Sequence, residues 1–284
     1  MGIQVKNIFY TYQKKASNAT LALKDVSFGI KDNDFVAIVG ETGSGKSTLA
    51  QCFNALLIPD NGDVLVGNYV INHKNRRGRK LKGLRKHVGL VFQFPEYQLF
   101  EETVEKDVAF GVKNFGIKKE EALERAHLAL KQVGLNESYY KRAPFDLSGG
   151  EKRKVAIAGI LAINPDILIF DEPTVGFDPQ SSKELMQLIV DFHKQGKTIV
   201  VITHDMDLVN TYAQKVFLLE KGELAFQGTP SELFAFIEGY DRLDTPSVIK
   251  VAQKLQEKGM KIDPKQIRNI NDLVEAIKQG RKKA

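Results

Sequence analysis

The sequence predicts an α/β fold with a mainly parallel β-sheet, and three observations support it. Short apolar runs, typical of buried strands, alternate with segments whose apolar residues recur at helical spacing. A glycine-rich turn, residues 40–48, lies between one such run and a segment that predicts a helix. Gln93, Asp171 and His204 each follow an apolar run, so we expect them to meet at the carboxyl edge of the sheet, where open α/β folds bind ligands.

The composition is ordinary for a soluble protein. The 284 residues suffice for one large or two small domains, and the net charge of +6 permits contact with an acidic surface without requiring nucleic acid. Cys52 is the one cysteine, which suits a reducing compartment. Residues 1–6 lack a signal-peptide pattern, and no apolar run approaches the ~20 residues that span a bilayer. We therefore expect any role in a membrane process to depend on a partner.

The N-terminal part of the chain predicts antiparallel β structure around the glycine-rich turn. Residues 3–12 are rich in β-branched and aromatic side chains, and residues 23–28 alternate apolar and polar, so both indicate strands. Residues 35–39 are all apolar and indicate a buried strand that leads into the turn. The next expected elements are a helix over 48–57 and a short hairpin of 64–66 with 69–71.

Residues 74–86 carry eight basic residues and no acidic one. Such a run is compatible with a solvated loop, with a membrane-surface or partner contact, or with nucleic acid. No aromatic residue is interleaved to stack on bases. We therefore favour the solvated loop and predict that nucleic acid is not a partner.

Strands and helices alternate through the middle of the chain. Apolar runs typical of strands covered on both faces occupy residues 88–92, 167–170 and 198–203. Helices are expected over 118–133, 154–163, 181–194 and 205–212, and a final hairpin pairs 216–219 with 224–226.

The composition becomes more polar after about residue 240. We therefore expect residues 1–240 to form one domain and residues 241–284 a small helical extension. Thr245 and Pro246 are typical of an N-cap followed by proline at the first helical position. The helix that they start should end at Gly259.

The glycine-rich turn has the composition of a phosphate-binding loop. It fits the pattern G-x-x-x-x-G-K-[ST], and its residues are Gly40, Glu41, Thr42, Gly43, Ser44, Gly45, Lys46, Ser47 and Thr48. The glycines let backbone N–H groups approach phosphate oxygens, and the N-terminus of the following helix adds further donors. Lys46 supplies a charge for the outer phosphates, and the Ser47 hydroxyl can bind Mg²⁺. These features predict a nucleoside triphosphate site, although a plain strand–helix turn has the same glycines.

The residues at the strand ends supply what phosphoryl transfer to water requires. Asp171 is suited to holding Mg²⁺, and Glu172 can orient or deprotonate the attacking water. Gln93 can contact both metal and water, and His204 can reach the outer phosphate. Each of these four residues could also be an ordinary turn residue or surface group without a catalytic role. Their shared position at one edge of the sheet favours a role in hydrolysis.

A second helix start with exposed N–H groups occurs at residues 147–151. Ser148 can cap the following helix, while Gly149 and Gly150 expose backbone donors; Glu151 closes the motif. If this motif and the phosphate loop lie on opposite lobes, one triphosphate cannot touch both within one chain. We therefore expect a head-to-tail dimer that ATP binding closes and hydrolysis releases.

In this order and spacing, the motifs resemble the ATPase subunit of an ATP-binding cassette transporter over roughly residues 3–235. The resemblance implies a P-loop NTPase fold, with a RecA-like core, an antiparallel β subdomain and a helical subdomain over about 94–165 that carries the signature motif. It implies these roles: phosphate binding by Lys46, Mg²⁺ binding by Ser47, Gln93 and Asp171, catalytic base Glu172, switch histidine His204, and cross-dimer contact Asp178. An aromatic residue also stacks on adenine in this family, with Tyr12 the first candidate and Tyr10 the second.

A narrower resemblance is to the ATPases of energy-coupling factor transporters. It is carried by residues 92–104, 107–111 and 155–161. The sequence of the first segment is similar to that of the second type of ATPase subunit in these transporters. These transporters take up vitamins and metal ions through two ATPase subunits, a transmembrane coupling protein and a substrate-binding membrane protein. The resemblance implies a second ATPase subunit, related or identical, and places the chain peripherally at the cytoplasmic face of the cell membrane. It also implies docking of the coupling protein near Pro95–Glu102, and only indirect contact with the substrate-binding protein.

Two residues depart from the family pattern without removing a catalytic group. Glu151 stands where Gln is commoner, and Phe177 stands where Leu is usual. Three alternatives stay open: another importer such as one for cobalt or nickel, a soluble ATPase of the same superfamily that acts on DNA or ribosomes, and a P-loop kinase. The sequence names no transported solute.

Overall fold

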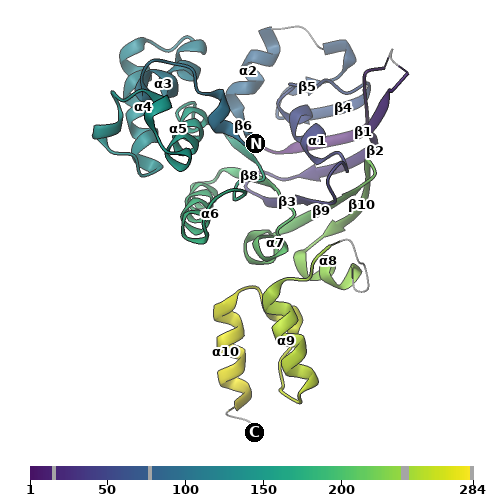
Figure 1. Cartoon of the computed structure of the whole chain (residues 1–284). Coiled ribbons are helices and arrows are strands. Elements are labelled where there is room, and N and C mark those ends of the chain that lie inside the picture. The colour runs from purple at the N-terminus through teal and green to yellow at the C-terminus, as the bar shows by residue number, and fades with distance from the viewer. Residues whose placement is uncertain (15–16, 76–78, 238–242, 282–284) are drawn as a thin grey trace.

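The computed structural model describes residues 1–14, 17–75, 79–237 and 243–281, and Figure 1 shows their arrangement. The strands are β1 (Ile3–Tyr12), β2 (Thr20–Ile30), β3 (Phe35–Val39), β4 (Asn61–Val66), β5 (Tyr69–Ile71), β6 (Val88–Val91), β7 (Ile167–Asp171), β8 (Thr198–Ile202), β9 (Lys215–Glu220) and β10 (Glu223–Gly228). The α-helices are α1 (Lys46–Phe53), α2 (Arg79–His87), α3 (Val104–Asn114), α4 (Lys119–Gln132), α5 (Gly149–Leu161), α6 (Pro179–Lys194), α7 (Met206–Tyr212), α8 (Pro230–Phe236), α9 (Ser247–Glu257) and α10 (Ile270–Arg281).

The larger sheet positions the candidate site. Its strand order is β10-β9-β3-β8-β7-β6, in which β9, β3, β8, β7 and β6 run parallel and β10 pairs antiparallel with β9. Every residue of β3, β7 and β8 is buried, because both faces of these strands are covered. The predicted mainly parallel sheet and the final hairpin are therefore confirmed.

The smaller sheet is antiparallel and has the strand order β2-β1-β4-β5. Helix α1 packs in the apolar cluster that joins the two sheets. Leu49 and Phe53 of α1 are fully buried there, together with Ile3 of β1 and Ile38 of β3. The helix after the glycine-rich turn is thus fixed by both sheets, which holds the turn itself in place.

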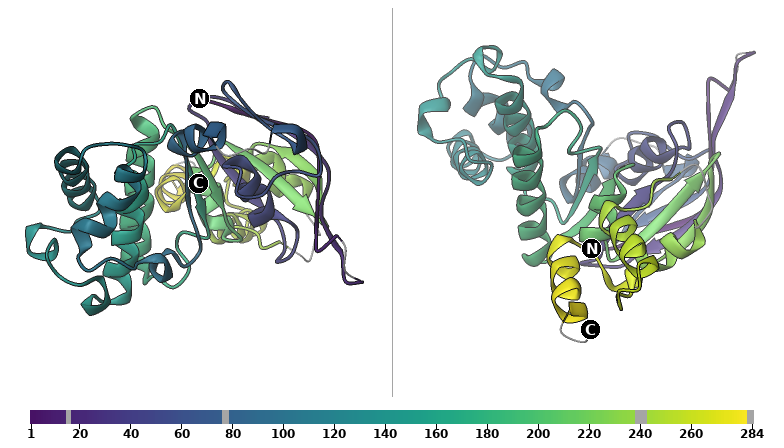
Figure 2. Two further views of the ribbon diagram at one scale, coloured as in Figure 1. Left: turned by 90° about the horizontal axis from the view of Figure 1, so that it is seen from above. Right: turned by 60° about the horizontal axis from the view of Figure 1, so that its bottom comes forward.

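Helices α3, α4 and α5 form a lobe on one side of the larger sheet, while α1 lies on the other side (Figures 1 and 2). Val108, Leu130 and Val155, one from each helix of the lobe, share a buried apolar cluster with Leu168 of β7. This lobe occupies most of the predicted helical subdomain over about 94–165. Among the described residues, no helix is both long and apolar enough to cross a membrane.

Helices α9 and α10 have an apolar cluster of their own, which buries Ala252 and Leu273. They are attached to α7 through hydrogen bonds: Asn210 Nδ2 donates to the carbonyl of Ile267 at 2.9 Å, and the Ser247 hydroxyl donates to Asp207 at 2.7 Å. The predicted domain boundary at residue 240 lies outside the described residues, so the division into 1–240 and 241–284 stays a prediction.

Helix α2 occupies much of the basic run 74–86, so the solvated-loop interpretation is wrong for its residues. Leu81 and Leu84 are buried on one side of the helix, and their burial outweighs the repulsion between exposed charges. The part of the run at residues 76–78 lies outside the described residues.

Several other helices either were not predicted or begin or end at a different residue than predicted. Helices α3 and α8 were not predicted, although Thr229 and Glu232 form a capping box at the start of α8. Helix α5 begins at Gly149 and not at Lys154, because its N-cap lies at the preceding serine. Helix α9 has Pro246 at the N-cap position, so the predicted cap at Thr245 is wrong by one residue. Helix α1 ends at Phe53, before the predicted residue 57.

Candidate functional site

A cleft of about 390 Å³ at the carboxyl edge of the larger sheet brings most of the predicted site together. The predicted residues that line it are Tyr12, Thr42, Gly43, Gly45, Lys46, Ser47, Thr48, Gln93, Asp171, Glu172 and His204. Thr20, Leu21 and Ala22 of β2 complete its wall and were missed. Their residue types do not indicate a ligand site. They lie beside Tyr12 because β2 pairs with β1, which the local sequence does not reveal.

Glycine is required at two positions of the phosphate loop. Gly40 and Gly45 have φ angles of +142° and +102°, which side chains disfavour. A Cβ atom at Gly40 would lie 2.1 Å from the carbonyl oxygen of Leu219, and one at Gly45 would lie 2.5 Å from that of Ala22. A Cβ at Gly43 would meet no described heavy atom within 4 Å, so the loop keeps free space beside the start of α1.

Lys46 is buried inside this loop. Its Nζ donates to the carbonyl oxygens of Gly40 and Glu41, both at 2.8 Å. Burial lowers the pKa of Lys46, while the nearby carboxylates of Glu172 and Asp171 act in the opposite direction. A phosphate oxygen would be a stronger partner for this ammonium than a neutral carbonyl.

Asp171 and Ser47 provide oxygen ligands in the same cleft. Burial raises the pKa of Asp171, a hydrogen bond with Ser47 lowers it, Glu172 raises it further and Lys46 lowers it. Ser47, Gln93 and Asp171 all line the cleft, and their oxygen atoms are the kind of ligand that Mg²⁺ prefers. These residues therefore fit a magnesium ion, which would also offset the unfavourable burial of the Asp171 carboxylate.

Glu172 is oriented by His204. Nδ1 of His204 lies 2.8 Å from Oε1 of Glu172, while Oε2 of Glu172 is buried and has no hydrogen-bond partner in the described part of the chain. Glu172 also has a φ of +50°, a left-handed conformation that is uncommon for a residue with a side chain. The site thus holds one carboxylate oxygen fixed and leaves the other able to accept a proton or a hydrogen bond.

Tyr12 faces the cleft and Tyr10 does not. The Tyr12 hydroxyl lies 3.1 Å from the Oγ1 atom of Thr48, and its ring is partly exposed. The ring of Tyr10 packs edge-on against Tyr12, with centroids 4.9 Å apart, and contacts the apolar core. Of the two aromatic candidates, only Tyr12 can offer a face to a bound ligand.

The signature residues lie on the other lobe. Ser148, Gly149 and Gly150 are exposed at the start of α5, and none of these described residues lines the cleft. Ser148 caps α5 as predicted, and its backbone N–H and hydroxyl both donate to Glu151 at 2.8 Å. Tyr139 donates to the same carboxylate at 2.9 Å, so Glu151 is held within its own subunit.

Asp178 is exposed and caps α6. It accepts hydrogen bonds from the backbone N–H groups of Gln180 and Ser181, each at 3.0 Å. Hydrogen bonds from Ser181 hold the pKa of Asp178 below its usual value. The predicted cross-dimer contact of Asp178 stays a prediction, because capping alone accounts for this geometry.

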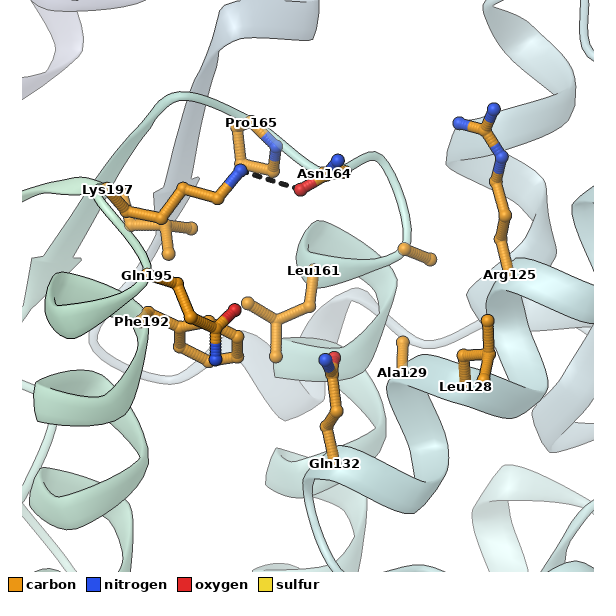
Figure 3. A pocket seen from close by; sticks show the side chains of 12 residues that line it. Arg125, Leu128, Ala129, Gln132, Leu161, Asn164, Pro165, Phe192, Gln195 and Lys197 are labelled. Carbon is orange, nitrogen blue, oxygen red and sulfur yellow. Dashed lines mark hydrogen bonds between the residues drawn. The ribbon is translucent and has the colours of Figure 1, made fainter.

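A second cavity, of about 320 Å³, lies between α4, the end of α5 and α6 (Figure 3). Lys197 Nζ donates to Asn164 at 2.6 Å on its rim, and the apolar side chains of Leu161 and Phe192 line its interior. Asn164 and Lys197 precede β7 and β8, so this cavity lies at the amino edge of the sheet, away from the phosphate loop. No predicted site residue lines it.

The chain is similar to known proteins over its whole length. A family model described as "ABC transporter" matches residues 23–175. The energy-coupling factor transporter ATP-binding protein EcfA2 of Streptococcus agalactiae is 48% identical over 282 residues, which cover 99% of this chain and 100% of the relative. The protein of the same name from Streptococcus thermophilus is 48% identical over 283 residues, with the same coverage.

Solved structures give the same picture. The structure of cbiO1 from Clostridium perfringens, described as part of the ABC transporter complex cbiONQ, has a TM-score of 0.73 and 38% identity, covering 90% of this chain and 96% of that one. A dimeric ATP-binding cassette in a post-hydrolysis state, bound to ADP and Pi, has a TM-score of 0.72 and 33% identity, covering 80% of this chain and 98% of that one. These likenesses confirm the predicted P-loop NTPase fold. The family match spans more than half of the chain and the curated relatives match over their whole length, so the chain belongs to the ATP-binding cassette transporter family, among the ATP-binding proteins of energy-coupling factor transporters.

Proposed function

We propose that the chain binds and hydrolyses ATP and thereby energises an energy-coupling factor importer for vitamins or other micronutrients. One observation carries this proposal: the cleft joins the phosphate loop to Gln93, Asp171, Glu172 and His204, while the signature residues lie on a separate lobe. A site divided in this way is completed when a second ATPase subunit supplies its own signature helix.

Within the cleft, each residue has a role that follows from its position. Lys46 and the loop N–H groups hold the phosphates, and Tyr12 offers its ring to the adenine. Ser47, Gln93 and Asp171 would hold Mg²⁺, which when bound neutralises charge on the phosphates. Glu172 accepts a proton from the attacking water at its free oxygen, while His204 keeps the other oxygen in place.

This chain supplies Ser148, Gly149, Gly150 and Glu151 to the nucleotide of the second subunit, whose own signature helix completes this chain's site, and Asp178 contacts the partner across the interface. The Glu151 carboxylate keeps the signature helix capped. The glutamate at a position where glutamine is commoner therefore leaves the backbone N–H donors at the start of this helix in place. We expect the partner to be a related ATPase subunit, with a second copy of this chain as the alternative.

A transmembrane coupling protein docks near Pro95–Glu102. Tyr97 and Phe100 of this segment are exposed, as is Phe94 just before it, and Phe100 packs edge-on against Phe110 with ring centroids 4.8 Å apart. Adjacent exposed aromatic residues are typical of an interaction surface. Such docking places the chain peripherally at the cytoplasmic face of the cell membrane, with only indirect contact to the substrate-binding protein and none to nucleic acid.

Purification of the chain from detergent-solubilised membranes tests this proposal. We expect an ATPase subunit and a polytopic coupling protein to co-purify, with ATPase activity in the assembled complex. Co-purification of nucleic acid in their place would contradict it and favour the soluble ATPase. A partner set without an exchangeable substrate-binding protein would favour another importer, such as one for cobalt or nickel.

A further inference from the structure

Arg153 on α5 contacts several segments of the nucleotide site at once. Its side chain is buried, with 5% relative exposure. One guanidinium nitrogen, Nη2, donates to the carbonyl oxygens of Gln93 at 2.8 Å and Glu172 at 3.2 Å, and the other, Nη1, donates to that of Val175. A single cation on the signature helix therefore joins the segments that follow β6 and β7.

The contacts extend to the segment that leads to Asp178. The guanidinium carbon of Arg153 lies 4.7 Å from the centre of the Phe177 ring, a cation–π contact. A Cβ atom at Gly176 would lie 3.7 Å from Nη1, so this segment runs close against the guanidinium. Phe177, which departs from the family pattern, thus supplies an aromatic face for Arg153 where leucine would supply none.

The contact with Glu172 bears on the proposed catalytic base. Glu172 has a left-handed φ of +50°, a conformation that persists only where surrounding contacts maintain it. Its backbone N–H donates to Ile202 at 2.9 Å, and its carbonyl accepts from Arg153. Loss of the Arg153 contact would let the backbone relax and move the carboxylate away from His204.

One acidic residue of the segment proposed to dock the coupling protein acts electrostatically on Arg153. Burial lowers the pKa of Arg153, and Glu96 opposes that effect. Glu96 lies in the 3₁₀ turn Pro95–Gln98, and its Oε2 atom is buried without a hydrogen-bond partner among the described residues. The docking segment therefore begins two residues after Gln93, whose carbonyl oxygen accepts a hydrogen bond from Arg153.

We infer that Arg153 is a positioning residue that couples the signature helix to the catalytic carboxylate of the same subunit. The inference rests on the proposed function, because it assigns a task in ATP hydrolysis. When the signature helix moves onto the partner's nucleotide, Arg153 carries that displacement to Gln93, Glu172 and the segment before Asp178. Hydrolysis at this subunit's own site then depends on closure at the other.

The test uses Arg153→Met and Arg153→Lys in the assembled complex. Lysine keeps the charge and most of the stem, but one ammonium cannot reproduce the guanidinium fork. Arg125→Met is the matched control, because Arg125 is a lobe arginine whose 2.6 Å ion pair with Glu121 lies within α4. We expect both Arg153 variants to lose about 10- to 100-fold in kcat, as misplaced catalytic groups do, while the Kd for ATP stays within about two-fold. The control should match wild type in both.

A second readout separates this inference from the proposed function. Hydrogen exchange of the Arg153→Lys complex should rise in peptides spanning 93–96 and 172–178 and stay unchanged in the phosphate loop. If wild type shows no Glu172-dependent hydrolysis, the proposed function fails, and the exchange pattern still decides on Arg153. A folded Arg153→Lys complex with wild-type kcat, or with unchanged exchange at 172–178, would overturn the inference, as would an equal loss in kcat and ATP affinity.

Discussion

His204 Nδ1 lies 2.8 Å from Oε1 of Glu172, and the second carboxylate oxygen of Glu172 is buried without a partner among the described residues. The two side chains come from different strands, because His204 follows β8 and Glu172 follows β7. Their meeting divides the carboxylate into one oxygen that His204 orients and one that keeps its capacity to accept a hydrogen bond.

Glu172→Gln should lower kcat by about 10²–10⁴, the usual worth of a general base, because an amide cannot take the proton from water. ATP binding should persist, since the phosphate loop is unchanged. The measurement is steady-state hydrolysis by the assembled complex, with Glu184→Gln on the exposed face of α6 as control. Turnover within a few-fold of wild type would remove Glu172 from the role of base.

Lys46→Ala should weaken ATP binding. Removing a charged hydrogen-bond donor costs about 1.5–3 kcal/mol, which corresponds to a rise of about 10- to 100-fold in Kd. Calorimetric titration with ATP and Mg²⁺ measures it, and Lys254→Ala on α9 serves as the exposed control. An unchanged Kd would show that the two carbonyls that bind Lys46 in this structure are its only partners.

The central part of the site could be predicted because short-range patterns determine it. Gln93, Asp171 and His204 each follow an apolar run, and parallel strands bring their carboxyl ends to one edge. The phosphate loop is contiguous, so its residue types alone indicate its chemistry. The signature serine could be predicted as a helix cap from its neighbours for the same reason.

What could not be predicted depends on contacts between distant segments or on small balances of energy. Thr20, Leu21 and Ala22 reach the cleft only through strand pairing, and Arg153 reaches Glu172 only through the packing of the lobe against the sheet. Helix α2 forms despite its charge, because two buried leucines stabilise it. The left-handed backbone of Glu172 leaves no trace in the local sequence, since glycine is the residue that normally marks it.

Gly40→Ala should destabilise the fold by about 2 kcal/mol or more, because the methyl group meets a carbonyl oxygen and the φ of +142° is strained for alanine. Urea unfolding measures the free energy. Gly29→Ala is the control, because a Cβ atom there would lie 4.0 Å from the carbonyl oxygen of Ile3, an ordinary van der Waals distance. Equal stability of the two variants would show that the loop adapts to a side chain.

Asp171→Asn should stabilise the nucleotide-free chain near neutral pH while abolishing hydrolysis. Burial raises the pKa of Asp171 in the folded state above its ordinary value of 3.8. Ionisation of Asp171 therefore destabilises the fold as pH rises from that ordinary value through the raised one. Thermal unfolding against pH checks this: the variant should lose less stability than wild type between acid and neutral pH.

Asp178→Asn supplies the comparison of opposite sign. Hydrogen bonds from Ser181 lower the folded-state pKa of Asp178, so its ionised form stabilises the fold above 3.8, and this contribution is lost as pH falls through the lowered value. The asparagine variant should not gain stability at neutral pH. A gain in both variants, or in neither, would contradict the assignment of Asp171 as a carboxylate buried for function.

ATP-dependent association measures most directly whether the site is completed by a second subunit. The Glu172→Gln chain is mixed with its co-purified ATPase partner, or is used alone if no such partner is found. In sedimentation its mass should change from that of a monomer to that of a dimer when ATP and Mg²⁺ are added. Ser148→Arg should prevent this change and leave ATP binding to the monomer intact, because Ser148 lies outside its own cleft. An unchanged mass with ATP, or loss of monomer ATP binding in Ser148→Arg, would contradict a site shared between subunits.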